Sequence, residues 1–526
     1  MFGLTEELPE SPENLESKQP ARTACLLACS ESYPKVMQYT SIAAAVAAAV
    51  VAYFISTFIY NIAFHPLRSF PGPLLWRATG LFKCYHFLRG DMPFAVRELH
   101  VRYGSVVRIS PGELAFSDTQ AFKDIYVHKM VKWKGMYGFK PEHVQDLANV
   151  TDPTHHAFLR RHMAAGFSET ALRNQESVLV QHVDLLINQL RERGAGGKVP
   201  QDMRDWFMWL TFDITGMLSF GAEFGGLRYA KSAEWVATLT DNVRVLMAMS
   251  ALFGYVGATT RSILTWIFMS GLIPSVAAHT QRTKDMLRER MDRKGAYDDR
   301  DYIIDGLINI NDHRVESNAV MLIMAGSETT STALTATLFA LLQTPDKMAR
   351  LTKEVRSTFS RDEDITMAST LDKLPYLMAC INESLRWYPP SVSGLARVVP
   401  KGGAKISGHY VPEGTIVAAW TWSVTRDPRY FADAYGFHPE RWLPGEDERF
   451  VNDELDASPP FSVGPRSCMG KNLAMAEMRL TLARMIYNFD VTLSTPFDGD
   501  WFKGQKAYLV WDKPSVLVNL TPVGES

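Results

Sequence analysis

Cysteine and net charge are both scarce in this sequence. The chain has 526 residues but only 5 cysteines, which are scattered and form no paired CxxC spacing of the kind that binds zinc. An odd, scattered set excludes a disulfide framework and fits a reduced, cytosol-facing body. The formal net charge is −2, and the sequence has no long basic cluster. Composition therefore gives no electrostatic argument for nucleic acid as a partner.

Internal repeats and low-complexity tracts are also missing from the body of the chain, where helical periodicity dominates. Hydrophobic residues make up 46% of the sequence, which is ample for a large core. Short apolar pieces between Gly and Pro turns predict strands at 106–109, 113–116, 405–406 and 416–419. We therefore predict one large domain of mainly α structure with small β-sheets.

One long uncharged hydrophobic run lies near the N-terminus. Residues 42–60 (IAAAVAAAVVAYFISTFIY) carry no charge, and about 20 such residues cross a bilayer as a helix. A cleaved signal peptide is disfavoured because a polar, acidic stretch precedes the run and a basic n-region is missing. A buried helix is disfavoured because the run is uniformly apolar rather than striped. Basic residues follow the run, so the positive-inside rule leaves the body in the cytosol.

The stretch after this run is rich in proline. In residues 65–73 (HPLRSFPGP) the prolines fix φ and remove backbone donors, which predicts a stiff, extended hinge. The predicted organisation is a polar tail at 1–40, a transmembrane anchor at 41–64, a hinge at 65–80 and a catalytic body at 81–526.

Cys468 carries the strongest chemical signal, within residues 461–470 (FSVGPRSCMG). This segment precedes the amphipathic run 471–488, and a cysteine at a helix N-terminus has its thiolate favoured by backbone N–H groups and the helix dipole. Gly464 permits a tight turn, and Gly470 lets the helix start approach a flat ligand. Arg466 is placed to pair with a carboxylate of that ligand. A lone cysteine is usually a small buried hydrophobe, but this combination describes a haem iron held by a cysteine thiolate.

The segment resembles the haem-binding loop of the cytochrome P450 family. That resemblance implies the P450 fold and haem b (iron protoporphyrin IX) as the cofactor. It also implies Cys468 as the axial ligand of the haem iron, with Phe461 and Gly470 beside the haem. The proline-rich hinge and residues 156–168 resemble those of fungal P450s of secondary metabolism. The long tail before the anchor departs from the usual short N-terminus of membrane-bound members.

A second motif lies in an apolar helix predicted at about 315–343. Residues 321–331 (MLIMAGSETTS) place Gly326 in mid-helix, where glycine costs about 1 kcal/mol relative to alanine. Thr329 can bond back to a carbonyl one turn earlier and open the helix locally. Taken alone, a core helix with a packing glycine and capped hydroxyls explains the pattern better. Beside Cys468 it resembles the family's distal oxygen-binding helix, which implies that Glu328 and Thr329 are the catalytic proton-relay pair.

A third pattern is structural. Glu383 and Arg386 share a helix face three residues apart, although such pairs are common and weak at surfaces. Residues 437–442 (FHPERW) resemble the family's loop that completes a buried Glu–Arg–Arg network. We therefore assign Glu383, Arg386 and Arg441 to the structure behind the haem and not to catalysis.

Cations are needed for the haem propionates. His156 and Arg160 lie four residues apart on one predicted helical face, for which the alternative is a solvated surface. By resemblance, Arg397 occupies a strand position from which family members reach a propionate. With Arg466 these residues are the four predicted propionate ligands.

The resemblance also implies which segments face the substrate. These are residues 134–139, parts of 246–274, the distal helix near Ile323 and Ala325, residues 391–395, and the C-terminal turn around Tyr508. The apolar run at 263–274 is too short to span a bilayer, and we expect it to dip into the membrane interface.

The predicted function is that of a haem-thiolate monooxygenase, single-pass in the endoplasmic reticulum membrane and facing the cytosol. We expect it to oxidise a hydrophobic polyketide, terpenoid or alkaloid intermediate with O2. The sequence after Cys468 is too short for a fused reductase, so electrons are expected from NADPH-cytochrome P450 reductase, with cytochrome b5 as a further partner. The alternatives are a haem-thiolate isomerase or dehydratase and a non-catalytic haem-binding membrane protein. The Glu328–Thr329 pair argues against both.

Overall fold

The computed structural model describes residues 19–128, 130–137, 145–231, 281–292, 302–310 and 314–524. Side chains are described from residue 39 onward. The predicted substrate-facing segment 246–274, with its apolar run 263–274, lies outside the described residues, as do residues 138 and 139. The chain divides into two units, Met1–His65 and Pro66–Ser526.

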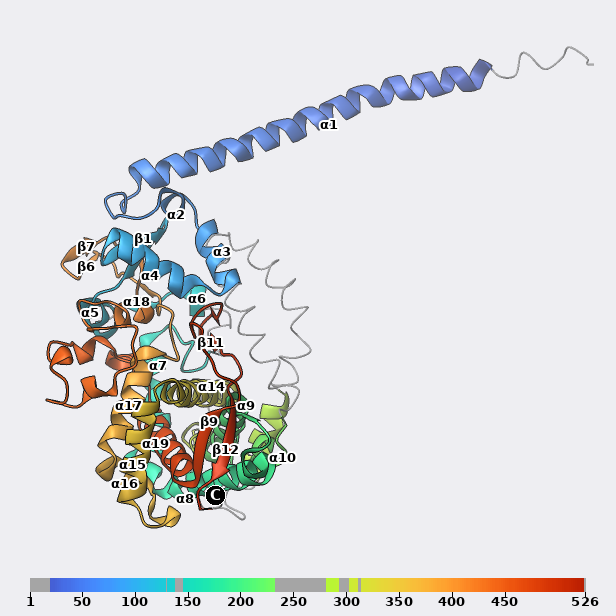
Figure 1. Ribbon diagram of the computed structural model, residues 1–526. Coiled ribbons are helices and arrows are strands. Elements are labelled where there is room, and N and C mark those ends of the chain that lie inside the picture. Colours follow the sequence, from blue (N-terminus) through green and yellow to red (C-terminus); the bar gives the residue numbers. More distant parts are fainter. Residues whose placement is uncertain are drawn as a thin grey trace, which may run out of the picture. The chain divides into compact units, whose positions relative to one another are not determined.

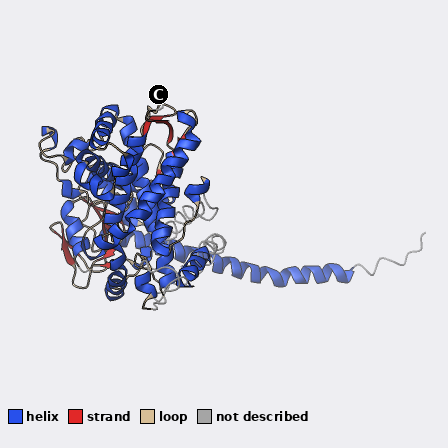
Figure 2. Ribbon diagram, turned by 90° about the horizontal axis from the view of Figure 1, so that it is seen from below, coloured by secondary structure: helices blue, strands red, loops and turns tan. Residues whose placement is uncertain are grey.

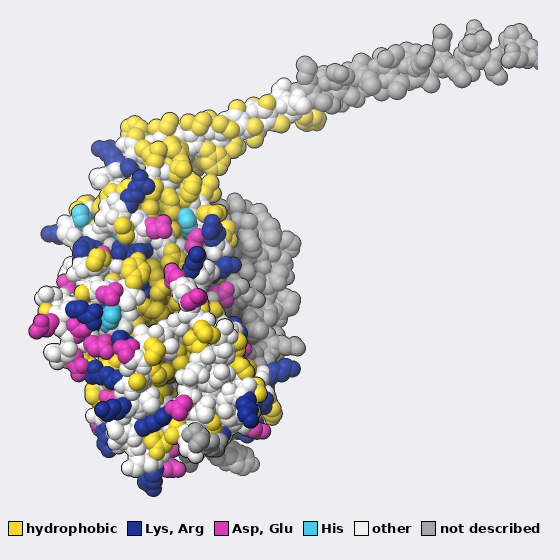
Figure 3. Space-filling view, in the orientation of Figure 1, with side chains coloured by type: hydrophobic (Ala, Val, Ile, Leu, Met, Phe, Trp, Pro, Cys, Tyr) yellow, Lys and Arg dark blue, Asp and Glu magenta, His cyan; other side chains and the backbone are white. Residues whose placement is uncertain are grey.

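The first unit contains the membrane-spanning candidate. Helix α1 (Gln19–Ile59) continues into a π-helical turn, η1 (Tyr60–Phe64). Residues Tyr39–Phe64 are long and apolar enough to cross a membrane, and their hydrophobic side chains appear as a yellow helix in Figure 3. The helix begins at Gln19, inside the predicted 1–40 tail, because an established helix propagates more easily than it nucleates.

The unit boundary falls at the beginning of the predicted hinge and not after it. Leu67 and Phe70 are buried in a core cluster of the body. The backbone N–H of Arg108 donates to the carbonyl of Pro71 over 2.7 Å, which fixes the proline-rich strand to the body. Most of the predicted 65–80 hinge therefore belongs to the body, because its apolar residues are buried there.

The body is mainly helical, as predicted, and Figure 2 shows its strands as small red patches among blue helices. The helices between residues 66 and 310 are α2 (Leu74–Ala78), α3 (Leu81–Arg89), α4 (Met92–Tyr103), α5 (Thr119–Phe122), α6 (Lys134–Tyr137), α7 (Pro153–Met163), α8 (Glu169–Gly194), α9 (Met203–Phe220), α10 (Gly226–Tyr229) and α13 (Asp305–Ile308) in the described part of the chain. The later helices are α14 (Val315–Gln343), α15 (Pro345–Thr358), α16 (Met367–Lys373), α17 (Pro375–Trp387), α18 (Thr421–Thr425) and α19 (Lys471–Asn488).

The strands form small sheets at the edges of the helical layer. A five-stranded sheet has the order β1 (Val106–Ser110), β2 (Glu113–Phe116), β8 (Ile416–Ala419), β5 (Arg397–Val398), β3 (Val131–Lys132). Its β2–β8 pair is parallel and its other pairs are antiparallel. A three-stranded sheet has the order β4 (Gln201–Asp202), β12 (Leu517–Pro522), β9 (Phe489–Leu493). Two hairpins complete the set: β6 (Ala404–Ile406) with β7 (His409–Val411), and β10 (Lys506–Ala507) with β11 (Trp511–Asp512).

Helix α14 runs through the middle of the body and packs against α9, α17 and α19 (Figure 1). Its hydrophobic residues join the largest core cluster, which also takes side chains from α8 and α15. Apolar residues cover almost the whole circumference of α14, and a helix of that composition is expected to be buried. The packing places α14 and α19, the two helices with the strongest motifs, against each other.

Candidate haem-thiolate site

The Cys468 loop is a tight turn held against the five-stranded sheet region. A 3-10 turn, η10 (Gly464–Arg466), follows Ser462, whose φ of 58° is strained for a residue with a side chain. Gly464 has a φ of 78°, and a Cβ there would overlap the carbonyl oxygen of Tyr126. The N–H of Cys468 donates to the carbonyl of Phe461 over 2.9 Å, which closes the loop. Sequence, turn and packing together fix the direction of the sulfur.

The Cys468 thiol differs from the expectation in its acidity. Its side chain has accessible surface, but the protein atoms crowded around the sulfur raise its pKa by desolvation. The Gly470 N–H and Arg160 act in the opposite direction and are outweighed. The predicted helix dipole is weak here because α19 begins only at Lys471, after the Gly470 cap. Coordination to a metal cation would favour the thiolate, because the metal replaces the thiol proton.

The sequence predicts that Gly470 lets the start of the helix approach a flat ligand. A Cβ there would lie 3.7 Å from a ring carbon of Phe167 and 4.0 Å from the Cys468 sulfur. These are ordinary contacts, so the packing of the polypeptide does not itself demand glycine at this cap. Phe461 is half-buried and packs on the main core, with the ammonium of Lys471 5.9 Å from its ring centre.

The four predicted propionate ligands come together in space. His156, on α7, is buried, and burial lowers its pKa to about 3, with further lowering from the positive charges of Arg466, Arg160 and Arg397. Burial also lowers the pKa of Arg466 to about 10, and Arg397 adds to that effect. Residues from α7, β5 and the Cys468 loop therefore share one positively charged region.

Lys132 is a fifth cation of this group, and the sequence interpretation missed it. It lies on β3, beside β5, is buried and donates to the carbonyl of Ala148. Burial lowers its pKa well below the ordinary value, and the charges of Arg466 and Arg397 contribute. Its sequence signal is a lysine on an otherwise apolar strand two residues from another lysine, a pattern too common to stand out. We call Lys132, His156, Arg160, Arg397 and Arg466 the cation cluster.

Backbone carbonyls hold these cations in position. Arg466 donates to the carbonyls of Val150, over 2.7 Å, and Thr151, over 3.2 Å. Arg160 donates to the carbonyl of Ser467 over 2.7 Å, which places it on the cysteine side of the cluster. The carboxylates of Asp146 and Asp152 also act on Lys132 and Arg466. Positive charge is in excess in this partly buried region, and it favours an anionic ligand. A dianionic group such as the paired propionates of haem fits this set of donors.

The distal motif lies on an unbroken part of α14. The Thr329 hydroxyl donates to the carbonyl of Ala325 over 2.8 Å, one turn earlier, as the sequence predicts. The predicted local opening does not accompany it, because α14 remains helical through this turn. A Cβ on Gly326 would come within 2.9 Å of the Thr215 hydroxyl on α9. The packing explanation therefore accounts for the glycine.

One face of this turn is accessible inside an otherwise buried helix. Ala325 is exposed, and Met321 and Met324 are half-buried. Ile323 points into the core and is fully buried, so of the two residues expected near the substrate only Ala325 is placed for contact. Glu328 is half-buried, and its carboxylate is paired with the ammonium of Lys513 at 2.5 Å. The sequence interpretation missed this lysine because it lies far along the chain, outside any motif.

The predicted Glu–Arg–Arg network is assembled and has no contact with solvent. Glu383 pairs with Arg386 at 2.7 Å and with Arg441 at 3.1 Å, and all three side chains are 0% exposed. Burial opposes the charge of Glu383, but the two guanidinium groups and hydrogen bonds outweigh it and lower its pKa. Arg386 also donates to the carbonyls of residues 425, 434 and 436. These contacts join α17 to the 425–442 segment and support a structural role.

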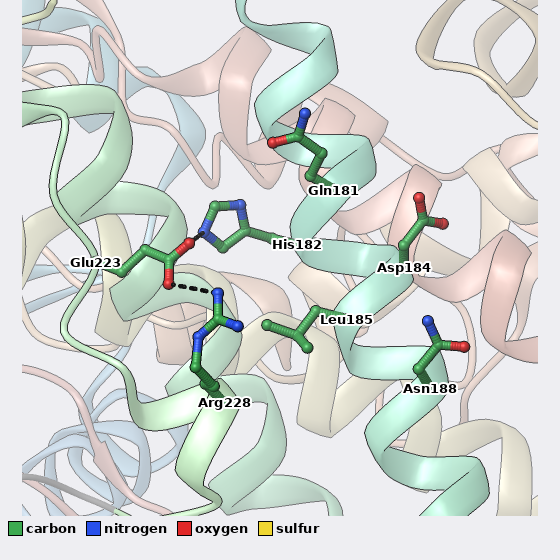
Figure 4. A pocket seen from close by; sticks show the side chains of 7 residues that line it. All are labelled: Gln181, His182, Asp184, Leu185, Asn188, Glu223 and Arg228. Carbon is green, nitrogen blue, oxygen red and sulfur yellow. Dashed lines mark hydrogen bonds and ion pairs between the residues drawn. The ribbon is translucent and has the colours of Figure 1, made fainter.

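A pocket with a volume of about 320 Å³ lies away from these elements. In Figure 4, Glu223 stands between His182 and Arg228, at 3.6 Å from the imidazole and 3.3 Å from the guanidinium. The His182 ring also bonds to the carbonyl of Val178 over 2.8 Å. The charged groups of this pocket face one another on α8 and the turn after α9, elements that carry none of the predicted site residues.

A cysteine loop, a nearby group of cations and an acid–hydroxyl pair on α14 are the features that the sequence predicts for a haem-thiolate protein. The comparisons with known proteins agree. The cytochrome P450 family model matches residues 70–515. Cytochrome P450 monooxygenase 1 of Neocamarosporium betae is 42% identical over 90% of this chain and 96% of its own length. Trichothecene C-15 hydroxylase of Fusarium sporotrichioides is 37% identical over 89% of this chain and 96% of its own.

Averantin hydroxylase of Dothistroma septosporum is 36% identical over 89% of this chain and 89% of its own length. The chain therefore belongs to the cytochrome P450 family. It is an oxidoreductase with monooxygenase activity and a haem cofactor, and such enzymes use a redox partner and hydrophobic substrates.

Proposed function

We propose that this enzyme hydroxylates a hydrophobic biosynthetic intermediate, a polyketide, terpenoid or alkaloid, with Cys468 as the axial ligand of haem b. The observation that carries the proposal is the cation cluster next to the Cys468 loop, since grouped positive charges are more stable beside a bound dianion. The named activities of the trichothecene and averantin relatives support the substrate class.

The bound haem supplies the redox chemistry: with two electrons and two protons it inserts one atom of O2 into a C–H bond and releases the other as water. The chain's own residues bind and orient. Cys468 donates electron density to the iron, and the cation cluster holds the propionates. The accessible face of α14 at Ala325 leaves room beside Glu328 and Thr329. We propose that Glu328 carries protons inward and that the Thr329 oxygen accepts and passes them on.

Electrons are proposed to come from NADPH-cytochrome P450 reductase, with cytochrome b5 as a further donor. We propose that Tyr39–Phe64 anchors the protein in the endoplasmic reticulum membrane with the body in the cytosol, because the candidate span is followed by basic residues. Protease treatment of sealed microsomes checks the orientation, and digestion of the body without detergent is the expected result.

The central experiment uses the carbon-monoxide adduct of the reduced full-length protein. The wild type should show the red-shifted Soret band of a thiolate-ligated haem, and Cys468→Ser should lose both the band and turnover. Cys380→Ala, at a buried cysteine of α17, is the matched control and should keep the band. Reconstitution with reductase then separates the monooxygenase from an isomerase or a ligand-storage protein. An unchanged spectrum in Cys468→Ser would contradict the proposal.

A further inference from the structure

Glu328, the acid of the proposed proton relay, is held in an ion pair with Lys513. The Glu328 carboxylate and the Lys513 ammonium lie 2.5 Å apart, with side-chain exposures of 16% and 4%. A pair this close in a nearly dry environment is held firmly, because either charge without the other would be poorly solvated. The carboxylate that should carry protons is thus bound to a cation from the other end of the chain.

Lys513 belongs to a C-terminal segment that is fixed to the 388–395 segment. The residue follows β11, and the indole N–H of Trp511 on that strand donates to the carbonyl of Pro389 over 2.9 Å. The hydroxyl of Ser393 donates to the carbonyl of Tyr508 over 2.7 Å. Residues 391–395 and the turn around Tyr508 are the segments that the sequence predicts to face the substrate. One continuous piece of chain therefore carries both part of the predicted substrate wall and the partner of Glu328.

An aromatic stack strengthens this connection. The ring of Tyr388 stacks on Trp511 with ring centres 4.3 Å apart, and its hydroxyl donates to Gln505 over 2.5 Å. Burial raises the pKa of Tyr388 well above its ordinary value, and the negative charge of Glu328 adds to that effect. Tyr388 is therefore neutral and close to Glu328. The charged partner that the structure shows for Glu328 is Lys513.

From this arrangement we propose that Lys513 is a positioning residue that holds Glu328 away from proton transfer until substrate binds. The proposal rests on the proposed function of Glu328. Substrate that contacts residues 391–395 and Tyr508 displaces the attached C-terminal segment and weakens the ion pair between Glu328 and Lys513. Glu328 then accepts a proton from solvent and donates it to the Thr329 oxygen. As a carboxylate again, it pairs with Lys513. The transfer is balanced, since one proton enters and one leaves, and it needs no further reactant.

The alternative is an ion pair that serves stability alone. A cycle of urea unfolding with Lys513→Met, Glu328→Gln and the double variant measures the pair without any turnover. We expect the double variant to recover at least about tenfold in the unfolding equilibrium over the sum of the single changes, which corresponds to about 1.4 kcal/mol. Additive effects would show that the pair contributes no coupling and would overturn the proposal at its first step.

The second measurement is NADPH consumption and hydrogen peroxide release by the reconstituted full-length enzyme without added substrate. Lys513→Met should raise both severalfold, because Glu328 is then available in the absence of substrate, and Lys513→Arg should restore the low rate. In the Glu328→Gln background, Lys513→Met should have no further effect. Lys503→Met, at an exposed lysine of the same segment, is the matched control.

The outcomes separate this proposal from the function itself. The positioning role is refuted if Lys513→Met and Lys503→Met behave alike. It is also refuted if the effect of Lys513→Met persists in the Glu328→Gln background, and neither result contradicts the monooxygenase activity. A wild-type enzyme that consumes no oxygen would instead contradict the proposed function. If Lys513→Met does not fold, Lys513→Gln is measured in its place: increased peroxide release without substrate supports the positioning role, and a rate equal to that of the wild type refutes it.

Discussion

The buried Glu–Arg–Arg network allows a demanding test of what stabilises the body. In the Glu383→Gln variant an amide replaces the carboxylate without a large change of shape. The carboxylate accepts from Arg386 at 2.7 and 2.8 Å, from Arg441 at 3.1 Å, from the Trp442 indole at 3.0 Å and from the backbone N–H of His438 at 2.8 Å. The amide N–H groups of the glutamine would face the N–H groups that the carboxylate now accepts from. Arg386 would lose its carboxylate partner in a region with no solvent contact, whereas Arg441 would keep its ion pair with Asp453.

Breaking a buried charge pair by removing one partner costs about 3–5 kcal/mol. At about 1.4 kcal/mol per tenfold change, the unfolding equilibrium should shift by about two to four orders of magnitude. The assay is urea unfolding followed by tryptophan fluorescence, with retention of the haem spectrum as a second probe. The urea midpoint of Glu383→Gln should lie well below that of the wild type.

The control for this prediction is a surface pair of similar geometry. Arg361 and Asp364 lie 2.7 Å apart, but their side chains are 70% and 40% exposed. Water already solvates both groups, so Asp364→Asn should leave the midpoint unchanged. Equal midpoints for Glu383→Gln and Asp364→Asn would refute the argument that burial gives the network its importance.

The remaining predictions concern the cysteine loop and a buried acid. Gly464→Ala should destabilise the protein by more than the roughly 1–2 kcal/mol expected for an alanine in the left-handed conformation, because its Cβ would also overlap the backbone of Tyr126. Gly445 has a similar φ of 81° with open space around it, so Gly445→Ala measures the backbone strain alone. Burial raises the pKa of Glu477 to about 8, so its stabilising contribution is complete below the unfolded pKa of about 4.5 and is lost as the pH rises towards 8. The stability of Glu477→Gln relative to the wild type should therefore increase as the pH rises from 5 to 9, which urea unfolding at several pH values measures. A difference in unfolding free energy between the two proteins that does not change with pH would contradict this prediction.

Much of the fold could be read from periodicity. The long apolar helix and the amphipathic helix after Cys468 have the predicted bounds, Val315–Gln343 and Lys471–Asn488. The strands at 113–116 and 416–419 also match their prediction, because Gly and Pro turns mark their ends. The hinge was less accurate, since proline content predicts stiffness but says nothing about whether neighbouring apolar residues are buried.

The sequence names candidate site residues that lie in a local motif or in a segment that resembles the family, and it does not single out two lysines outside such segments. Cys468, Gly464 and Arg466 lie within one loop, and their spacing carries the chemistry. Lys132 and Lys513 became visible only when sheet pairing and the C-terminal segment placed them beside residues distant in sequence. The acidity of the Cys468 thiol was misjudged for the same reason, because crowding around the sulfur depends on the whole fold.

The cation cluster has a consequence for how much enzyme a cell can maintain. The arginines of the cluster lie close enough to repel one another, and burial together with the same repulsion lowers the pKa values of His156 and Lys132. A ligand that binds only the folded state shifts the folding equilibrium towards that state as its concentration rises. Polypeptide made faster than porphyrin becomes available would then stay in the unfolded pool and be degraded. We expect the steady-state level of this protein to follow iron and porphyrin nutrition even when its messenger RNA is constant.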